Sequence, residues 1–229
     1  MRTIIIGDIH GCHRQLSDLL TFLNPDPDTD RLILLGDLFD RGPDSWEVFQ
    51  TVQWLAASFG DRFVLLRGNH EDYLLTEKLT LKQRMVWNRV GRGTTAASFK
   101  KHGARMEDAI PFLEEHTQLY FREEGLQCVH AGLAVDPIWE NDPWTMVHDH
   151  GIVLQNQYTG PFTVTGHIAL DVPVWFAGDG EYTEVVPWGE DRLLPPQGIL
   201  CIDTGCGKGG PLTALVLEDG VARLERTLG

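Results

Sequence analysis

The feature that most constrains the fold is a run of aliphatic residues at 32–35 and the polar loop that follows it. Four consecutive aliphatic side chains, LILL, are typical of a strand buried on both faces, as in a parallel sheet. Glycines enclose the loop at 36–42, which carries Asp37, Asp40 and Arg41. Because α/β proteins bind ligands at the carboxyl ends of such strands, this loop is a candidate for holding cations and an anion. For this stretch alone, a polar loop with a helix cap is the other interpretation.

The same succession of strand, polar loop and amphipathic helix occurs three times in the first third of the chain. The three expected strands are residues 3–7, 32–35 and 63–66. Leucines at helical spacing predict a helix over residues 16–23, and the prolines of 24–27 end it. A second helix is expected over residues 46–55, capped by Asp44. Alternation of this kind indicates a largely parallel sheet with right-handed crossovers, so the three loops should meet at one edge.

Residues 79–116 differ in character from those before them. They predict short helices interrupted by glycines, without a strand pattern, and we expect a helical cap inserted beside the loops. In the second half, turn residues at 123–125, 178–180 and 218–220 each separate two strand-like runs, which predicts hairpins. A mixed or antiparallel sheet should therefore pack on the first. We expect one α/β domain over residues 1–229.

Composition narrows the class of protein. A hydrophobic content of 42% and a charged content of 23% are typical of a soluble globular chain, and no apolar run approaches a membrane span. Residues 1–7 lead directly into a strand, without the apolar region and cleavage site of a signal peptide. Four cysteines that form no Cys-x-x-Cys pair favour reduced thiols and a cytoplasmic location. They are Cys12, Cys128, Cys201 and Cys206.

The net charge limits the partners. A formal charge of −14 argues against broad, sequence-independent nucleic-acid binding, which relies on a basic surface. It does not exclude a phosphorylated substrate, because a few arginines and bound metal ions can make one electropositive point on an acidic protein. The oligomeric state cannot be predicted from these features.

Side chains suited to metal binding lie at the ends of the expected strands. They are Asp8, His10, Asp37, Asn69, His130 and His167. Carboxylate, imidazole and amide oxygen suit divalent manganese, iron and zinc. Six such residues are too many for one tetrahedral ion, whereas two ions that share an aspartate would use them all. Taken alone, either of the last two histidines is more often a hydrogen-bonded structural residue. We interpret His102, His116, His148 and His150 as surface residues.

The motifs that contain these residues resemble those of a known family. They are GDIHG at 7–11, GDLFDRG at 36–42, GNHE at 68–71, VHAG at 129–132 and TGH at 165–167. In this order they resemble the calcineurin-like metallophosphoesterases of the phosphoprotein-phosphatase family. The match is nearest to small bacterial and phage serine/threonine phosphatases and to symmetrical diadenosine tetraphosphatases, and it covers nearly the whole chain. The combination of three long motifs is highly specific.

This resemblance implies a fold and a metal centre. The fold is an α/β/β/α sandwich of two mixed sheets flanked by helices, with a small helical cap. The cofactors are two divalent ions, with manganese favoured and iron or zinc as alternatives. Asp8, His10 and His167 would hold one ion, Asn69 and His130 the other, and Asp37 would bridge both.

The resemblance also implies catalytic roles. A hydroxide that bridges the two ions would attack phosphorus in line, without a phosphoenzyme. Arg41 and Arg67 would bind phosphate oxygens, where a planar guanidinium group is better suited than an ammonium group. His70 would protonate the leaving oxygen, and Asp40 would fix the tautomer of His70.

The chain departs from the family pattern at two points. Ile168 follows His167 where the family usually has threonine, and residues 144–146 read WTM where many bacterial members have Trp-x-Arg. That arginine would bind phosphate, and we expect Arg89 or Arg92 of the cap to replace it. The DTG sequence at 203–205 also resembles a family strand end, and we assign it a structural role.

Three functions follow from these observations. The leading hypothesis is a phosphomonoesterase that acts on phosphoserine or phosphothreonine proteins. The alternative is a hydrolase of dinucleoside polyphosphates, which would need an aromatic base pocket such as Trp87 and Phe99 could form. A non-catalytic phosphate-binding scaffold is the third reading, and it is disfavoured because neither a ligand nor His70 is missing.

Overall fold

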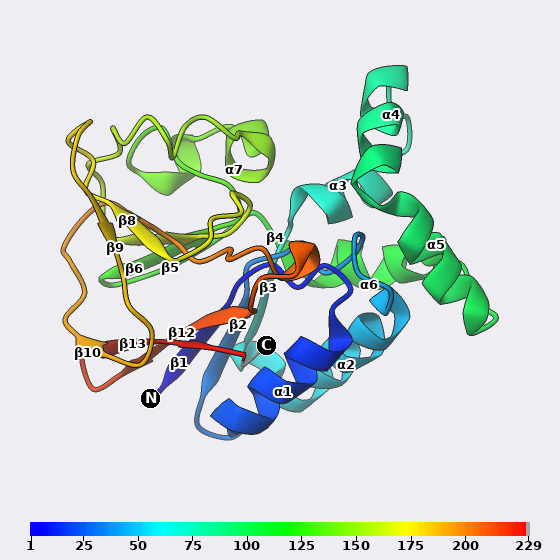
Figure 1. The fold of residues 1–229 in the computed structure, drawn as a ribbon, viewed down its shortest axis with the longest axis horizontal. Helices are drawn as coiled ribbons and strands as arrows, with labels where there is room; N and C mark the ends of the chain where they lie inside the picture. The colour runs from blue at the N-terminus through cyan, green and yellow to red at the C-terminus, as the bar shows by residue number, and fades with distance from the viewer. Residues whose placement is uncertain (228–229) are drawn as a thin grey trace.

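The computed structural model describes residues 1–227, which form two stacked sheets with helices on the outer face of each (Figure 1). The strand order of the first sheet, sheet A, is β10-β13-β12-β1-β2-β3-β4. Its strands are β1 (Thr3–Ile6), β2 (Arg31–Leu34), β3 (Phe63–Leu66), β4 (Thr117–Gln118), β10 (Asp191–Arg192), β12 (Thr213–Glu218) and β13 (Val221–Arg226).

The second sheet, sheet B, has the order β5-β6-β7-β11-β8-β9. Its strands are β5 (Tyr120–Glu123), β6 (Leu126–Val129), β7 (Thr163–Thr165), β8 (Val174–Phe176), β9 (Thr183–Val185) and β11 (Ile199–Cys201). Both sheets mix parallel and antiparallel pairs, which confirms the predicted α/β class with two mixed sheets.

The pairing of the strands agrees with the sequence pattern. Strands β1, β2 and β3 pair in parallel, as their aliphatic composition predicts. Three hairpins, β5–β6, β8–β9 and β12–β13, turn where the sequence predicts them. Strand β12 pairs with β1 in antiparallel fashion, so the last part of the chain completes the sheet that the first part begins.

The helices surround the sheets. They are α1 (His13–Leu23), α2 (Ser45–Phe59), α3 (Asn69–Leu75), α4 (Leu81–Val90), α5 (Arg92–Lys101), α6 (Ile110–His116) and α7 (Pro143–His148). The 3-10 turns are η1 (Gly60–Arg62), η2 (Met106–Ala109), η3 (Ile138–Glu140) and η4 (Cys206–Lys208). None of the helices formed by residues 1–227 is long and apolar enough to cross a membrane.

The ends of the first two helices test the predicted signals. Helix α1 ends at Asn24, whose left-handed backbone (φ 43°) precedes Pro25, in agreement with the predicted stop. Asp44 occupies the N-cap position of α2, but its side chain makes no cap hydrogen bond. The predicted capping role of Asp44 is therefore wrong in its mechanism.

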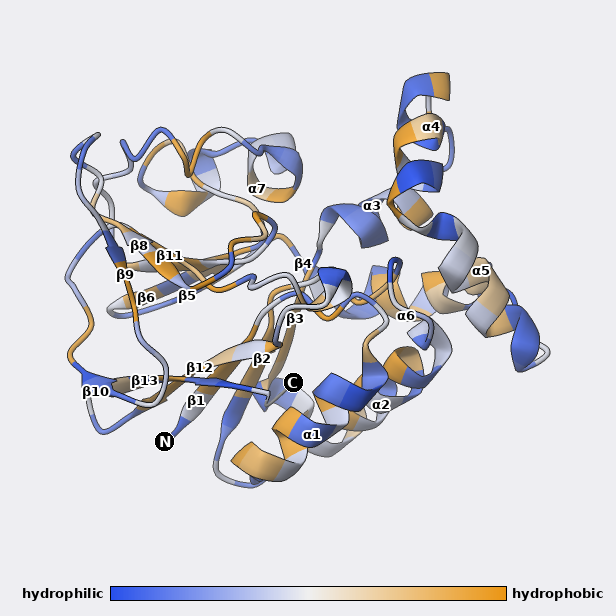
Figure 2. Cartoon of the chain, viewed as in Figure 1, coloured by the Kyte–Doolittle hydropathy of each residue, from blue (hydrophilic) through white to orange (hydrophobic). Residues whose placement is uncertain are grey.

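Three apolar clusters hold the layers together. One joins α1, α2 and the cap region to sheet A, the second fills the space between the sheets, and the third lies between sheet B and α7. In Figure 2 the orange, apolar residues concentrate on the central strands and on parts of α1 and α2. This layering places the carboxyl ends of β1, β2 and β3 beside loops of sheet B.

Residues 79–116, the cap segment, contain α4, α5, η2 and α6. Figure 1 shows α4 standing away from the sheets, with α5 leading back toward α2. Trp87 and Phe99 are buried at the base of this segment. A capping function for the segment stays a prediction.

Candidate metal centre

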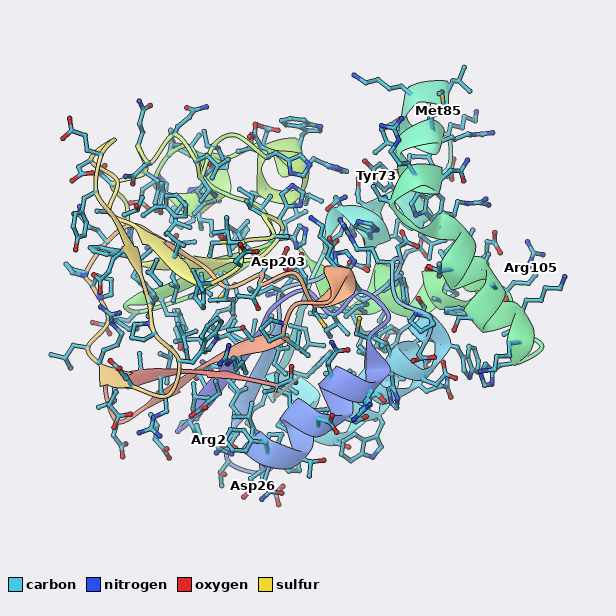
Figure 3. All side chains as sticks on the ribbon, in the orientation of Figure 1. Arg2, Asp26, Tyr73, Met85, Arg105 and Asp203 are labelled. Carbon is cyan, nitrogen blue, oxygen red and sulfur yellow. The ribbon has the colours of Figure 1, made fainter. Side chains whose placement is uncertain are left out.

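The six predicted metal ligands meet where the two sheets face each other. Asp8, Asp37 and Asn69 follow β1, β2 and β3 of sheet A. His130 and His167 follow β6 and β7 of sheet B. All six side chains, including that of His10, are buried. Asp203, whose charge acts on Asp8, and Tyr73, whose ring lies 6.3 Å from that of His70, are labelled in Figure 3.

Asp37 lies at the centre of the cluster and presents its two oxygens in different directions. Its Oδ2 atom is 3.5 Å from Nε2 of His10, and its Oδ1 atom is 3.4 Å from Nε2 of His130. Nε2 of His10 is also 3.9 Å from Oδ2 of Asp8, and Nε2 of His130 is 3.3 Å from Oδ1 of Asn69. A carboxylate between two groups of donors is the arrangement that a bridging ligand needs.

His167 belongs to a different group from the one predicted. Its Nδ1 atom lies 3.0 Å from Oδ1 of Asn69 and 3.2 Å from Nε2 of His130. Only its backbone N–H meets Asp8, at 3.0 Å from Oδ2. The predicted grouping of His167 with Asp8 and His10 is therefore wrong. The ring of His167 points toward Asn69 and His130, and its contact with Asp8 is made by the backbone N–H.

His70 lies at the edge of the first group. Its Nε2 atom is 3.7 Å from Oδ2 of Asp37, and donor atoms of His10, Asp37 and His70 lie within 4.8 Å of one another. Its other nitrogen, Nδ1, lies 2.6 Å from Oδ2 of Asp40. Nε2 is thus the atom of His70 that faces the cluster, either as a ligand or as the proton donor that the sequence predicts.

The electrostatics of the cluster favour bound cations. Burial, followed by Asp203 and Asp37, raises the pKa of Asp8 well above its ordinary value. Burial and Asp37 raise the pKa of Glu71 to about 7. Four acidic side chains are thus buried together: Asp8, Asp37, Glu71 and Asp203. Cations bound between them would relieve their mutual repulsion. Burial lowers the pKa of His10 to about 3, which leaves its ring neutral and able to coordinate.

The donor set fits a pair of divalent ions. Nδ1 of His167, Nε2 of His130 and Oδ1 of Asn69 lie 3.0–3.3 Å from one another. Atoms that carry lone pairs and converge in this way are suited to binding one cation. Carboxylate, imidazole and amide oxygen together are ligands that manganese, iron and zinc accept. The residues therefore fit the two ions that the sequence predicts.

Backbone carbonyls orient the histidine ligands. Nδ1 of His10 lies 2.9 Å from the carbonyl oxygen of Phe39, and Nδ1 of His130 lies 2.8 Å from that of Leu35. Each contact fixes the ring and leaves Nε2 free for the cluster. The sequence offered no signal for these contacts, because carbonyl oxygens belong to every residue.

Glu71 joins two of the loops. Its Oε2 atom accepts the N–H of Asp37 at 2.7 Å and that of Gly68 at 3.1 Å, and Oε1 accepts the N–H of Leu38 at 2.9 Å. The GNHE motif contains Glu71 but does not by itself indicate a role for it. Its position at the start of α3, directly after His70, was the available signal.

Unusual backbone geometry is concentrated at the cluster. Five of the eight non-glycine residues with positive φ in the described part of the chain lie here. They are His10, Asp37, Asp40, Arg41 and His167. Such conformations cost about 1–3 kcal/mol each and persist where surrounding contacts enforce them. Close approach adds a constraint at Gly166, where a Cβ atom would lie 2.0 Å from Oδ1 of Asp8.

The two predicted phosphate-binding arginines beside the metal motifs, Arg41 and Arg67, differ in their hydrogen-bond partners. Nε of Arg41 is buried without a hydrogen-bond partner among residues 1–227. Arg67 donates from Nε to Oγ1 of Thr117 at 3.2 Å, and its Nη1 atom is 3.8 Å from Oδ1 of Asp72. Arg41 thus has an uncommitted donor, whereas Arg67 is already held by neighbours.

The two arginines of the cap segment do not converge. Arg89 is exposed and lines a shallow hollow on α4 with residues that include Met85, labelled in Figure 3. Arg92 lies over the ring of Trp87, 5.0 Å from its centroid, and lines a cavity of about 560 Å³ that also contains Tyr73. Only Arg92 is close to a residue that contacts the site, and a role for either arginine stays a prediction.

Two histidines interpreted as surface residues lie beside the cluster. Nε2 of His148 is 2.8 Å from Oδ2 of Asp72. The ring of His150 stacks on that of His167 with 4.1 Å between centroids, although His150 is exposed. The prediction that His148 and His150 are only surface residues is therefore incomplete. Helix α7 packs against α3, which brings both histidines beside the site. His102 instead pairs with Glu47, at 2.9 Å.

Comparison with known proteins adds independent information. Residues 1–180 match the model of the family described as calcineurin-like phosphoesterase. A symmetrical bis(5'-nucleosyl)-tetraphosphatase of Edwardsiella ictaluri is 48% identical, over 96% of this chain and 94% of its own length. An asymmetrical bis(5'-nucleosyl)-tetraphosphatase of Oceanobacillus iheyensis is 29% identical, over 93% of this chain and 88% of its own length.

A solved structure supports the fold. The metallophosphoesterase of Sphaerobacter thermophilus superimposes with a TM-score of 0.68 at 16% identity, over 100% of this chain and 89% of its own. At that level of identity the likeness concerns the fold alone.

Proposed function

The chain belongs to the calcineurin-like phosphoesterase family, and on this premise we propose that it hydrolyses dinucleoside polyphosphates with the help of two divalent metal ions. The observation that carries the substrate class is the 48% identity with a symmetrical bis(5'-nucleosyl)-tetraphosphatase over nearly the full length of both chains. The sequence alone favoured a protein phosphatase. The relatives support the alternative better.

The residues divide into two ligand groups that share Asp37. Asp8 and His10 face one side of its carboxylate. Asn69, His130 and His167 lie together, with His130 nearest the other oxygen. When bound, two ions would activate a water molecule for attack on phosphorus and neutralise the charge of the phosphoryl oxygens. Manganese is the ion we favour.

The remaining groups act on the substrate. Nε of Arg41 has no partner among the described residues, which suits Arg41 for binding a phosphoryl oxygen. Nε of Arg67 is bonded to Thr117, so Arg67 would bind phosphate through its Nη atoms. His70, held through Nδ1 by Asp40, presents Nε2 toward the cluster and would donate a proton to the leaving oxygen.

One observation favours a second candidate, hydrolysis of phosphoserine or phosphothreonine. Symmetrical cleavage of a dinucleoside tetraphosphate releases a nucleoside diphosphate, and a phosphate of that kind has a second pKa of about 6. It leaves with little need of a proton. A serine alkoxide is a far poorer leaving group, so the His70–Asp40 pair would matter most for an alkyl ester.

A substrate panel separates these functions. The protein loaded with Mn²⁺ would be given diadenosine tetraphosphate, a phosphoserine peptide and p-nitrophenyl phosphate side by side. We expect the highest kcat/KM for the dinucleotide and ADP as its only nucleotide product. AMP together with ATP would indicate asymmetrical cleavage. A higher kcat/KM for the peptide would reverse the proposal in favour of the second candidate, and no turnover with two bound ions would favour the scaffold.

A further inference from the structure

One stripe of the cap segment is directed at Asp40. Trp87, Gly91 and Thr95 are spaced four residues apart, from α4 through its junction with α5. At Gly91 the backbone comes so close to the loop that a Cβ atom would lie 2.2 Å from the nitrogen of Arg41. Gly91 also has a φ of 123°, which side chains of other residues rarely allow. The junction between the two helices therefore rests directly on the Asp40 loop.

The other two members of the stripe donate hydrogen bonds to the carboxylate of Asp40. Nε1 of Trp87 donates to Oδ2 at 2.7 Å, and Oγ1 of Thr95 donates to Oδ1 at 2.5 Å. The hydroxyl of Thr95 also accepts the backbone N–H of Asp40 at 2.9 Å. Oδ2 is the oxygen that meets Nδ1 of His70, so His70 and Trp87 share one acceptor atom.

These contacts determine the orientation of the carboxylate. The χ2 torsion of an aspartate has broad preferences, so its partners decide the plane of the group. All four side chains of this network are buried: Asp40, His70, Trp87 and Thr95. Removing one donor would therefore leave a carboxylate oxygen of Asp40 short of a hydrogen bond, which costs free energy. With one cap residue on each oxygen, Oδ2 is held toward the ring of His70.

We propose that Trp87 is a positioning residue for proton donation: through Asp40 it orients His70 toward the leaving oxygen of the substrate. Thr95 acts on the other oxygen in the same way. The inference rests on the general-acid role proposed above for His70. The effect should be largest for phosphate esters with poor leaving groups and small for a dinucleoside tetraphosphate.

The indole also packs against its surroundings, and the test has to separate that role from the hydrogen bond. Tyr73 stacks on the ring of Trp87 at 6.0 Å, and Arg92 lies over it at 5.0 Å. Trp87→Phe keeps an aromatic ring for both neighbours and removes the N–H. Thr95→Val removes the hydroxyl at nearly constant volume, and Thr95→Ser retains it. Trp54→Phe, at an exposed position on α2, is the matched control.

The readout is the dependence of the rate on the leaving group. Phenyl phosphate and p-nitrophenyl phosphate are similar in size, but phenolate leaves much less readily without a proton. We expect Trp87→Phe to lower kcat/KM for phenyl phosphate roughly tenfold more than for p-nitrophenyl phosphate, as loss of one hydrogen bond to a buried charged group allows. Thr95→Val should act in the same direction. Thr95→Ser and Trp54→Phe should leave the ratio of the two rates unchanged.

Two controls make the result decisive. Manganese content and thermal unfolding are measured for each variant, and His70→Asn is assayed in parallel. If His70→Asn changes the ratio and Trp87→Phe does not, Trp87 is a packing residue and the proposal is overturned. If His70→Asn leaves the ratio unchanged, the general-acid role fails and the positioning role falls with it. The products formed from diadenosine tetraphosphate would still decide the proposed function separately.

Discussion

Nδ1 of His70 lies 2.6 Å from Oδ2 of Asp40, and both side chains are almost completely buried. Burial by itself lowers the pKa of His70, but the charge of Asp37 and the hydrogen bond to Asp40 outweigh it, so the pKa is raised above its ordinary value. Both contacts favour the protonated form of the His70 ring. The pair is thus suited to donating a proton near the metal ligands.

His70→Asn should slow the hydrolysis of a phosphoserine peptide about 100-fold more than that of p-nitrophenyl phosphate, since general acid catalysis contributes roughly 10²–10⁴ where the leaving group is poor. The effect on diadenosine tetraphosphate should be small, because the departing diphosphate needs little protonation. Steady-state rates for the three substrates provide the check. Equal losses on all of them, in a variant that still binds two ions, would contradict the assignment.

Asp37→Asn should reduce activity by about 100-fold or more, because one changed residue weakens both ligand groups. The manganese content of the wild-type chain at saturation should be two ions, and it should fall in the variant. Elemental analysis and kcat measure the two effects. Asp18→Asn, at an exposed position on α1, is the control. One ion per wild-type chain, or near wild-type turnover in Asp37→Asn, would show that the bridge is misassigned.

Arg41→Ala should weaken inhibition by inorganic phosphate and lower kcat/KM with manganese content unchanged. A charge-assisted hydrogen bond contributes about 1.5–3 kcal/mol, so the expected loss is roughly 10- to 150-fold. Arg67→Ala should lose less, since Thr117 and Asp72 already engage its side chain. Arg14→Ala, on the exposed side of α1, is the control for the removal of a positive charge. The same phosphate inhibition constant in all four proteins would mean that neither arginine faces the substrate.

Loading the metal-free protein with Mn²⁺ should release protons. Burial and neighbouring carboxylates raise the pKa of Asp8 well above its ordinary value and that of Glu71 to about 7. Each group therefore holds a proton over a range of pH in which an ordinary carboxyl is ionised. A cation favours the ionised form, so it displaces the proton, and metal affinity should fall as the pH falls below about 7.

Calorimetric titration in buffers of different ionisation enthalpy measures this release directly. The heat of Mn²⁺ binding should vary with the buffer, and more strongly at pH 6 than at pH 8. Heats that agree in every buffer would show that the carboxylates are already ionised in the metal-free protein.

The sequence predicted the elements and residues whose signals are local. The aliphatic runs of β1, β2 and β3 indicate parallel strands whatever the rest of the chain does, and the polar residues after them must then share one edge. Glycines beside these residues marked where the backbone has to turn or approach closely. The first sheet and the meeting of Asp8, Asp37 and Asn69 at its edge followed from these features, whereas the second sheet was expected from the hairpin turns.

The contacts that the sequence missed depend on packing between distant segments. The direction of the His167 ring is set by Asn69 and His130, which reach it from other strands. His150 meets His167 only through the path of the chain after α7. The hydrogen bond between Trp87 and Asp40 forms only when α4 and α5 pack against the loop after β2. The spacing of residues along the chain does not predict that packing.

The antiparallel pairing of β1 with β12 has a consequence for how the protein is made. Thr3 lies opposite Leu217, so that side of β1 stays unpaired until the chain has been made as far as β12. Closing so long a loop is slow, because its entropy must be lost before the contact stabilises anything. Asp8 and His167 likewise come together only late in synthesis. Until β12 is in place, β1 therefore presents an unpaired apolar edge, and edges of that kind favour aggregation.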